Sequence, residues 1–288
     1  MKCRHCRSEL NFVLVDLGSA PPSNAFLTDL TMRRPEKWFP LKVLVCERCW
    51  LVQTEDYSRA SELFNEEYAY FSSFSESWVR HGEKFIDESV RRFGLNSESL
   101  VLEIGSNDGW LLQGVQQRGI QCLGIEPTAS TASAARQKGI PVIEKFFGLQ
   151  LAEQLASQGQ FADLVVGVNV LAHVPDINDF VAGVSTVLKP NGVCSFEFPH
   201  LLNLITELQF DTIYHEHFSY LAFETVTKIL GEKGLTVFDV ETLGTHGGSL
   251  RVFSQLTEGG QRQVMASVKE LVDVEQRAGM KTQSFYRN

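Results

Sequence analysis

The chain reads LVLEIGSNDG from Leu100 to Gly109, an apolar run that closes on a glycine-rich turn. Glycine lets the backbone turn tightly and approach a ligand closely. The residues that follow, Trp110–Arg118, have the spacing of a helix. The stretch therefore predicts a strand, a turn and a helix whose N-terminal amides face a ligand.

The same alternation of strand and helix continues along the chain. We expect further strands at Cys122–Ile125, Val142–Ile143, Leu164–Val168 and Val193–Phe198, and helices at Trp78–Phe93, Ser130–Lys138, Leu149–Ser157 and Ile177–Leu188. Repeated strand–helix units predict an α/β fold with a parallel sheet and helices on both faces. Leu235–Val240 and Leu250–Phe253 flank a glycine-rich turn and are expected to form an antiparallel edge, followed by a helix over residues 261–282.

A second element of a cofactor site follows about twenty residues after the first, where a carboxylate can accept both ribose hydroxyls of a nucleoside. It is Glu126, in the stretch GIEP (124–127). NAD and S-adenosylmethionine share this geometry. The turn lacks the Gly-x-Gly-x-x-Gly pattern that serves a pyrophosphate, whereas Glu103 and Asp108 suit a sulfonium ligand with an ammonium group. The sequence therefore favours S-adenosylmethionine over NAD and over a turn without a ligand.

The strand Leu164–Val168 ends in NVLAHVP (169–175). Ligands of open α/β sheets bind beyond the carboxyl ends of the strands, so Asn169 and His173 are expected near the site. A lone histidine is more often structural, but this one lies on the rim where chemistry is expected. The predicted cofactor-binding residues are Glu103, Gly105, Asn107, Asp108, Gly109, Glu126 and Asn169.

Four of the six cysteines form two Cys-x-x-Cys pairs, Cys3/Cys6 and Cys46/Cys49, within residues 1–58. Four thiolates leave no open position on a zinc ion, so the site would be structural. A thioredoxin-like redox pair is the first alternative, but neither pair lies at a strand-to-helix junction. A nucleic-acid zinc ribbon is the second, and the near balance of charge in this segment counts against it.

Composition excludes some classes of protein. The net charge of −9 argues against a nucleic-acid partner, where a basic face is expected. The chain has neither an apolar run of membrane-spanning length nor the apolar stretch of a secretory signal after Met1. We therefore expect a cytoplasmic protein without a membrane partner, and a monomer.

The segment FDTIYHEHFSY (210–220) concentrates polar chemistry. Its histidines and glutamate could bind a metal. Alternatively, the segment could supply a base, an orienting group and an acid for enolate chemistry. The simplest alternative is a solvated polar loop, but the high content of aromatic residues in this segment argues against a solvated loop.

The order of these motifs resembles a known family. After the two cysteine pairs come YAYFSS (68–73), EIGSNDG (103–109), NVLAHV (169–174), YHEHFSY (214–220) and HGGSLR (246–251). This series is similar to the deoxysugar C-methyltransferases that carry an N-terminal zinc-binding domain, and the resemblance covers almost the whole chain. It implies a Rossmann-like class I methyltransferase domain preceded by a small zinc-binding domain.

The resemblance also suggests a domain layout. We expect a zinc-binding domain at 1–58, a connector and helix at 59–98, an S-adenosylmethionine-binding domain at 99–256, and a linking helix at 257–288. Members of the family continue into a second Rossmann-like domain that helps to hold the sugar nucleotide. Because the chain stops at Asn288, we expect it to lack that domain and to handle the sugar nucleotide poorly.

The implied reaction is methylation of a carbon next to the ketone of a nucleotide-linked 4-keto-deoxysugar, through an enolate. In an extended segment His215 and His217 point to one side and Tyr214 and Glu216 to the other, so the residues alone leave two candidate bases. The resemblance favours His217. The other roles are listed together: Glu216 and His173 orient or polarise, Tyr214 hydrogen-bonds the substrate, and Tyr68 or Tyr70 closes the pocket.

Two rival functions remain open from the sequence. An O- or N-methyltransferase acting on a sugar or another small molecule needs only a base near a hydroxyl or amine. A catalytically inert module would keep the zinc scaffold with a degenerate Rossmann domain, and the intact turn and Glu126 argue against it.

Overall fold

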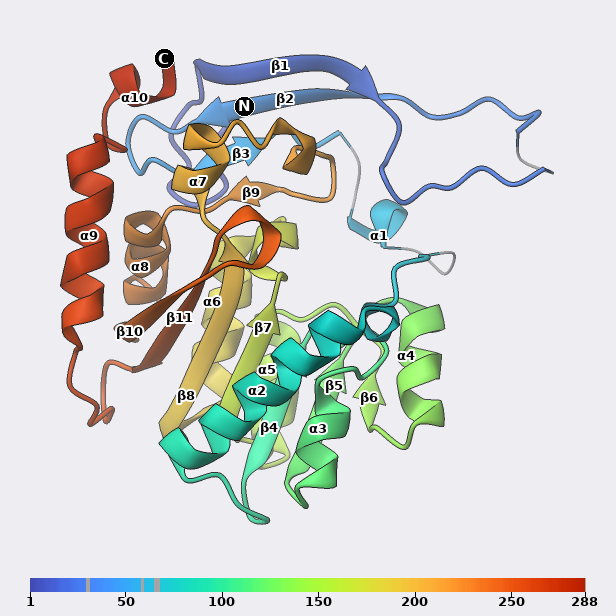
Figure 1. Cartoon of the computed structure of the whole chain (residues 1–288), viewed down its shortest axis with the longest axis vertical. Helices are drawn as coiled ribbons and strands as arrows, with labels where there is room; N and C mark the ends of the chain where they lie inside the picture. The colour runs from blue at the N-terminus through green and yellow to red at the C-terminus, as the bar shows by residue number, and fades with distance from the viewer. Residues whose placement is uncertain (30–31, 58–59, 65–67, 288) are drawn as a thin grey trace.

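The computed structural model describes residues 1–29, 32–57, 60–64 and 68–287. Their strands form a seven-stranded sheet, in the order β10-β11-β8-β7-β4-β5-β6, and a four-stranded sheet, in the order β1-β2-β3-β9. Figure 1 shows the small sheet above the large one, with the helices packed around the large sheet.

The large sheet confirms the predicted fold class. Its parallel strands are β4 (Leu100–Ile104), β5 (Gln121–Ile125), β6 (Val142–Ile143), β7 (Ala162–Val168) and β8 (Leu188–Pro199). The antiparallel edge is formed by β11 (Ser249–Leu256) on β8 and β10 (Leu235–Leu243) on β11. The chain runs outward from β4 to β6 and then returns to β7 on the other side of β4. The strand order therefore reverses between β4 and β7, where open α/β sheets bind their ligands.

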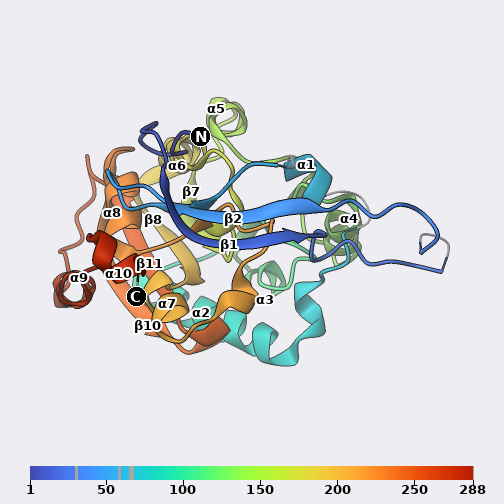
Figure 2. The same ribbon diagram turned by 90° about the horizontal axis from the view of Figure 1, so that it is seen from above.

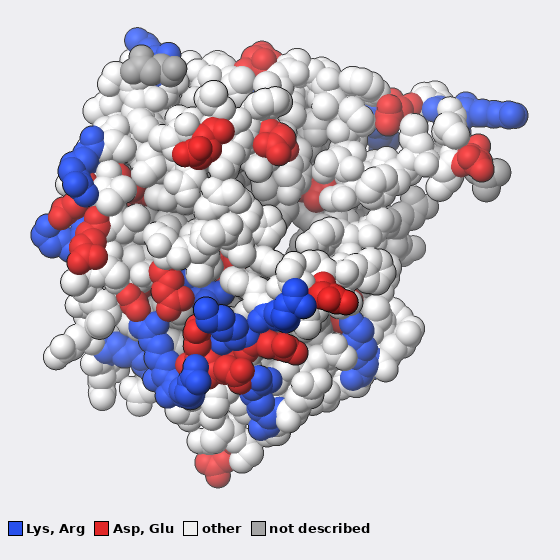
Figure 3. Space-filling view, in the orientation of Figure 1, with Lys and Arg blue, Asp and Glu red and all other residues white. Residues whose placement is uncertain are grey.

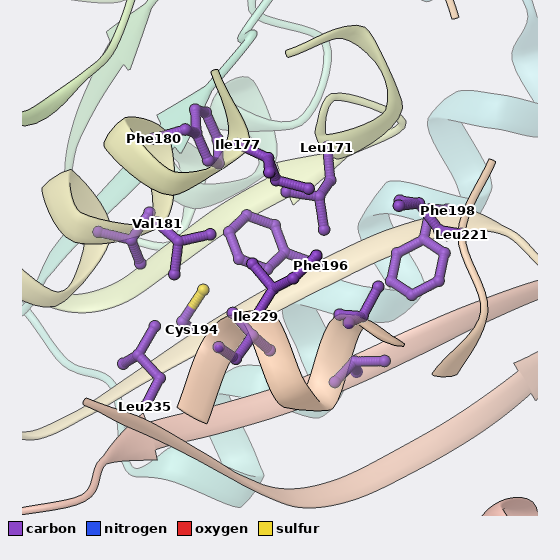
Figure 4. Close-up of a cluster of buried hydrophobic side chains, with 14 of the residues drawn as sticks. Leu171, Ile177, Phe180, Val181, Cys194, Phe196, Phe198, Leu221, Ile229 and Leu235 are labelled. Carbon is purple, nitrogen blue, oxygen red and sulfur yellow. The ribbon is translucent and has the colours of Figure 1, made fainter. Parts of the chain in front are cut away.

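Helices cover both faces of this sheet. They are α2 (Glu76–Phe93), α3 (Leu112–Gln117), α4 (Ala129–Gln137), α5 (Leu149–Ser157), α6 (Ile177–Val187) and α8 (Phe223–Gly231). On one face, Phe85 and Ile86 of α2 pack with Leu112 of α3. On the other, α6 and α8 converge on Phe196 of β8, as Figure 4 shows for Phe180 and Ile229.

Helix α2 has clear start and stop signals. The Ser75 side chain accepts a hydrogen bond from the Trp78 amide at its N-terminus, and Gly94 ends it in the left-handed conformation with φ of 69°. The surface around α2 carries both acidic and basic side chains, as Figure 3 shows. Arg118, for example, lies 2.6 Å from Asp87 of α2.

The small sheet joins segments that are far apart in the chain. It contains β1 (Phe12–Ala20), β2 (Phe39–Val45), β3 (Val52–Thr54) and β9 (Ser219–Tyr220), all antiparallel. Val52 of β3 pairs with Tyr220 of β9. The segment 210–220 is therefore hydrogen-bonded to the cysteine-bearing unit. Between β1 and β2 the chain projects away from the body, as Figure 1 and Figure 2 both show.

The structure changes the prediction for the C-terminal region. The helix expected over 261–282 is shorter, because α9 spans Ala266–Ala278 and a separate turn of helix, α10, spans Gln283–Arg287. The Gln255 side chain exchanges two hydrogen bonds with the backbone of Arg262, and the Met265 amide donates to the Phe238 carbonyl. These bonds hold residues 262–265 along the sheet edge and delay the helix.

Other short elements were not predicted, including α1 (Ala60–Leu63), α7 (Leu201–Thr206), α8 and β9. The predicted domain boundary between residues 58 and 59 lies outside the described residues, and the boundaries after 98 and 256 stay predictions. Among the described residues, every helix is too short or too polar to span a membrane.

Candidate active site

A cavity of about 560 Å³ collects the carboxyl ends of β4, β5 and β7, the connector and the segment 210–220. Four of the predicted cofactor residues line it, namely Gly105, Asn107, Glu126 and Asn169. All six predicted catalytic residues line it too, namely Tyr68, Tyr70, His173, Tyr214, Glu216 and His217. The tertiary structure therefore brings together residues from five separate segments of the chain.

Glu126 directly follows β5 and faces the glycine-rich turn. Its carboxylate accepts hydrogen bonds from the amides of Asn107, at 2.8 Å, and Thr128, at 2.9 Å. The Thr128 hydroxyl donates to the same carboxylate at 2.5 Å. Of the four or so lone-pair directions of a carboxylate, about one, on Oε2, is left for a ribose hydroxyl. Gly105 has φ of +68°, and a Cβ there would lie 2.4 Å from Val170. The turn therefore requires glycine for both its conformation and its packing.

The remaining turn residues, Glu103, Asp108 and Gly109, are not among the residues lining the cavity. Glu103 is fully buried with no hydrogen-bond partner on either oxygen among the described residues. Burial, with Glu126 and Asp108 nearby, raises the pKa of Glu103 well above its ordinary value. Glu103 thus lies behind the turn without a hydrogen-bond partner, where a diphosphate would add unfavourable negative charge and a cationic ligand would offset the cost of burying the carboxyl group. The donor set therefore fits S-adenosylmethionine.

Asp108 and Asn107 hold the connector over the site. Asp108 lies 2.9 Å from the Lys138 ammonium group and accepts a hydrogen bond from the Ser73 hydroxyl. Asn107 accepts a hydrogen bond from the Ser72 amide at 2.9 Å and donates to the Tyr70 carbonyl at 3.0 Å. Through these bonds the turn fixes the segment that carries Tyr70.

His217 is held as a neutral imidazole. Its Nδ1 lies 2.9 Å from the Thr212 carbonyl oxygen, so Nδ1 carries the proton and Nε2 accepts. The Tyr214 hydroxyl donates to that Nε2 at 2.9 Å. Burial, followed by the nearby His173, lowers the pKa of His217 well below its ordinary value.

His173 forms the opposite wall of this cluster. Its ring centroid lies 4.7 Å from that of His217, and its Nδ1 donates to the Glu216 carbonyl oxygen at 2.9 Å. Burial lowers the pKa of His173 to about 4. The cavity therefore holds two imidazoles that are unprotonated at neutral pH, and burial makes both weaker proton acceptors than a free histidine.

The expected orientation of the two candidate bases was wrong. The segment is not extended, because the His217 amide donates to the Tyr214 carbonyl at 3.0 Å and closes a turn. The turn brings the rings of Tyr214 and His217 to a centroid separation of 4.1 Å. His215 instead points to the carbonyls of Phe39 and Pro40, at 3.2 and 3.3 Å, and does not line the cavity.

Several cavity residues were missed by sequence reasoning. They include Asn24, Trp78, Trp110, Lys145, Phe146, Asp176, Asp179 and His246. Only His246 carried a signal, because it begins the HGGSLR motif. Its ring meets Trp78 edge-on with centroids 4.9 Å apart.

The four paired cysteines converge, as predicted. The sulfurs of Cys3 and Cys49 lie 3.5 Å apart, as do those of Cys6 and Cys46, and all four lie within 4.8 Å of one another. Tetrahedral zinc with Zn–S bonds of 2.3 Å places its ligands about 3.8 Å apart. The cluster therefore fits one structural zinc ion with no open position.

Comparison with known proteins agrees with this geometry. Residues 3–64 match a zinc binding domain, residues 78–240 a methyltransferase domain, and residues 244–288 the C-methyltransferase C-terminal domain. The chain is 35% identical to the C-methyltransferase NovU of Streptomyces niveus over 286 residues, which are 99% of this chain and 68% of that protein. The chain belongs to the zinc-containing C-methyltransferase family. The methyltransferase is thus S-adenosylmethionine-dependent, as the turn predicted, and the NAD and inert-module alternatives are set aside.

More distant relatives share only part of the C-methyltransferase. The ubiquinone biosynthesis O-methyltransferase of Bradyrhizobium sp. (strain ORS 278) is 29% identical over 151 residues, 44% of this chain and 58% of that protein. Among solved structures, PH0226 from Pyrococcus horikoshii OT3 matches 65% of this chain and 94% of its own, with a TM-score of 0.53 and 16% identity. A methyltransferase from Clostridium acetobutylicum ATCC 824 matches 64% and 92%, with a TM-score of 0.50 and 14% identity. These likenesses show the fold alone.

Proposed function

We propose that this C-methyltransferase methylates a carbon next to the ketone of a nucleotide-linked 4-keto-deoxysugar. The observation that carries the proposal is the Tyr214–His217 pair, a neutral imidazole joined to a phenol at the cavity wall. A hydrogen next to a ketone is weakly acidic because its loss gives an enolate. Carbon methylation therefore needs a base for that proton and a donor for the enolate oxygen, and the pair offers one of each.

We assign His217 as the base. The Thr212 carbonyl fixes its Nδ1–H and leaves the Nε2 lone pair to accept a proton. The Tyr214 hydroxyl donates to that lone pair. If the ketone oxygen of the bound sugar takes the Tyr214 hydrogen bond, Nε2 is freed to remove the proton from the adjacent carbon, and the same hydrogen bond then stabilises the enolate oxygen that forms.

The other predicted residues take supporting roles in this proposal. S-adenosylmethionine supplies the electrophilic methyl group, with Glu126 on its ribose and Gly105, Asn107 and Asn169 around it. His173 and Glu216 would orient the sugar, and Tyr68 or Tyr70 would close the pocket from the connector. The low pKa of His173 keeps its imidazole neutral at working pH.

Hydrogen exchange tests the proposal against methylation of oxygen or nitrogen. The methyltransferase is incubated with a nucleotide-linked 4-keto sugar and S-adenosylhomocysteine in deuterium oxide, so that methyl transfer is impossible. A C-methyltransferase of this mechanism exchanges the hydrogen beside the ketone. An enzyme that methylates a hydroxyl or an amine does not need to remove that hydrogen, so it should not exchange it. Absence of exchange across a panel of nucleotide-linked 4-keto sugars would contradict the proposal.

A further inference from the structure

The zinc-binding unit reaches into the active site through a turn that follows β1. The Ala25 amide donates to the Pro22 carbonyl at 3.2 Å, which places Ser23 and Asn24 at the centre of the turn. The two prolines before them, Pro21 and Pro22, restrict the backbone that leads into it. Asn24 lines the cavity even though it belongs to the zinc-binding unit.

Asn24 contacts both carboxylate oxygens of Glu216. Its Nδ2 donates to Oε1 at 2.8 Å and to Oε2 at 2.9 Å, and the Ser23 hydroxyl donates to Oε1 at 3.2 Å. These donors fix the direction in which the carboxylate of Glu216 points. The backbone of Glu216 is fixed from the other side, because its carbonyl accepts from His173.

No Lys or Arg forms an ion pair with Glu216 among the residues that the structure describes, although its side chain is 2% exposed. The ionisable groups that act on it or adjoin it are Tyr68 from the connector, Tyr214 from its own segment and the neighbouring ring of His173. None of these carries a positive charge at neutral pH. Among the described residues, the donors of Asn24 and Ser23 are therefore its stabilising partners.

These donors oppose the effect of burial. Burial has the larger effect and raises the pKa of Glu216 above its ordinary value, whereas the hydrogen bonds from Asn24 and Ser23 limit that rise. An ionised carboxylate only accepts hydrogen bonds, whereas a protonated one also donates. The donors thus decide whether Glu216 presents an acceptor to a sugar hydroxyl.

We propose that Asn24 is a positioning residue of the active site, which holds the Glu216 carboxylate as an acceptor facing the bound sugar. This inference rests on the proposed function, in which Glu216 orients the substrate. It makes the zinc-binding unit a working part of the site rather than a separate scaffold. A structural alternative is that Asn24 merely ties the projecting segment to the body of the protein.

The experiment compares Asn24→Ala and Asn24→Asp with Leu27→Ala as a matched control. Leu27 lies in the same segment, is 52% exposed and does not line the cavity. The first measurement needs no substrate. The carboxyl carbon of Glu216 is followed by 13C NMR in glutamate-labelled, zinc-loaded protein as the pH is changed, with Glu216→Gln to assign its resonance. Asn24→Ala should raise the pKa of Glu216 by about one pH unit, the scale of a lost hydrogen bond to a charged group.

Asn24→Asp should raise that pKa further, because two carboxylates would then face each other. Leu27→Ala should leave it unchanged. The second measurement is kcat against pH on an accepted 4-keto sugar. The acid limb should move to higher pH by the same amount in Asn24→Ala, with kcat returning to within about threefold of wild type on the alkaline side. If Asn24→Ala lowered kcat only by disturbing the structure, kcat would not recover as the pH rises.

The two measurements separate failure of this inference from failure of the proposed function. If no 4-keto sugar is turned over but the pKa of Glu216 rises in Asn24→Ala, the proposed function fails and the hold of Asn24 on the carboxylate stands. If the pKa of Glu216 and the acid limb both stay where the wild type has them, Asn24 does not position Glu216 and the inference is overturned.

Discussion

The Tyr214 hydroxyl and the His217 imidazole are joined by a hydrogen bond of 2.9 Å, inside a turn that also turns His215 away from the cavity. The turn therefore distinguishes two histidines that are alike in the sequence. Of these two histidines, only His217 lines the cavity.

Replacing His217 by Asn should abolish proton abstraction but not cofactor binding. We expect exchange of the hydrogen beside the ketone, in deuterium oxide with S-adenosylhomocysteine, to fall by about 100-fold or more, the contribution of a general base. His215→Asn is the matched control, because His215 lies outside the cavity, and it should exchange at nearly the wild-type rate. If His215→Asn loses exchange and His217→Asn does not, the assignment of the base is reversed.

Glu126→Ala should weaken S-adenosylmethionine binding. The expected loss is about 1.5–3 kcal/mol, the scale of a charge-assisted hydrogen bond, measured by titration calorimetry. Glu153→Ala removes an exposed carboxylate on α5 and should bind as the wild type does. Equal affinities for the wild type and Glu126→Ala would show that Glu126 does not bind the ribose.

Zinc should be bound once per chain and should be needed for folding of the N-terminal unit. We expect elemental analysis of protein purified without chelator to find one zinc ion. Cys46→Ser should lose it and unfold the small sheet, because the binding energy of a structural zinc is folding energy. Cys122→Ser, which changes a cysteine outside the cluster, should keep the metal. Zinc retained at full stoichiometry in Cys46→Ser would contradict the four-thiolate site.

The buried His173 predicts how stability depends on pH. Its pKa is lowered from 6.5 to about 4 in the folded protein, so below pH 6.5 the unfolded chain binds the proton more readily. The stabilisation is fully present above pH 6.5 and is lost as the pH falls towards 4. Denaturant unfolding should show a smaller decrease in the free energy of unfolding over this range for His173→Gln than for the wild type. Parallel curves would mean that His173 titrates normally in the folded state.

The strand, the glycine turn and the helix from Leu100 to Arg118 could be predicted from local sequence, and with them the parallel sheet. The antiparallel edge and the zinc cluster could be predicted in the same way. These features are readable because backbone geometry imposes a fixed period on buried side chains, and because metal ligands must recur at short spacings.

The closure of the site, in contrast, depends on contacts between segments that are far apart in the chain. The pairing of Val52 with Tyr220, and the hold of Asn24 on Glu216 across 192 positions of the chain, leave no local pattern to read. The turn at Tyr214–His217 forms where β9 joins the zinc-binding unit, and it overrides the alternation that an extended segment would show. Such contacts depend on packing between distant segments, whose free energy is shared over the whole fold rather than carried by neighbouring residues.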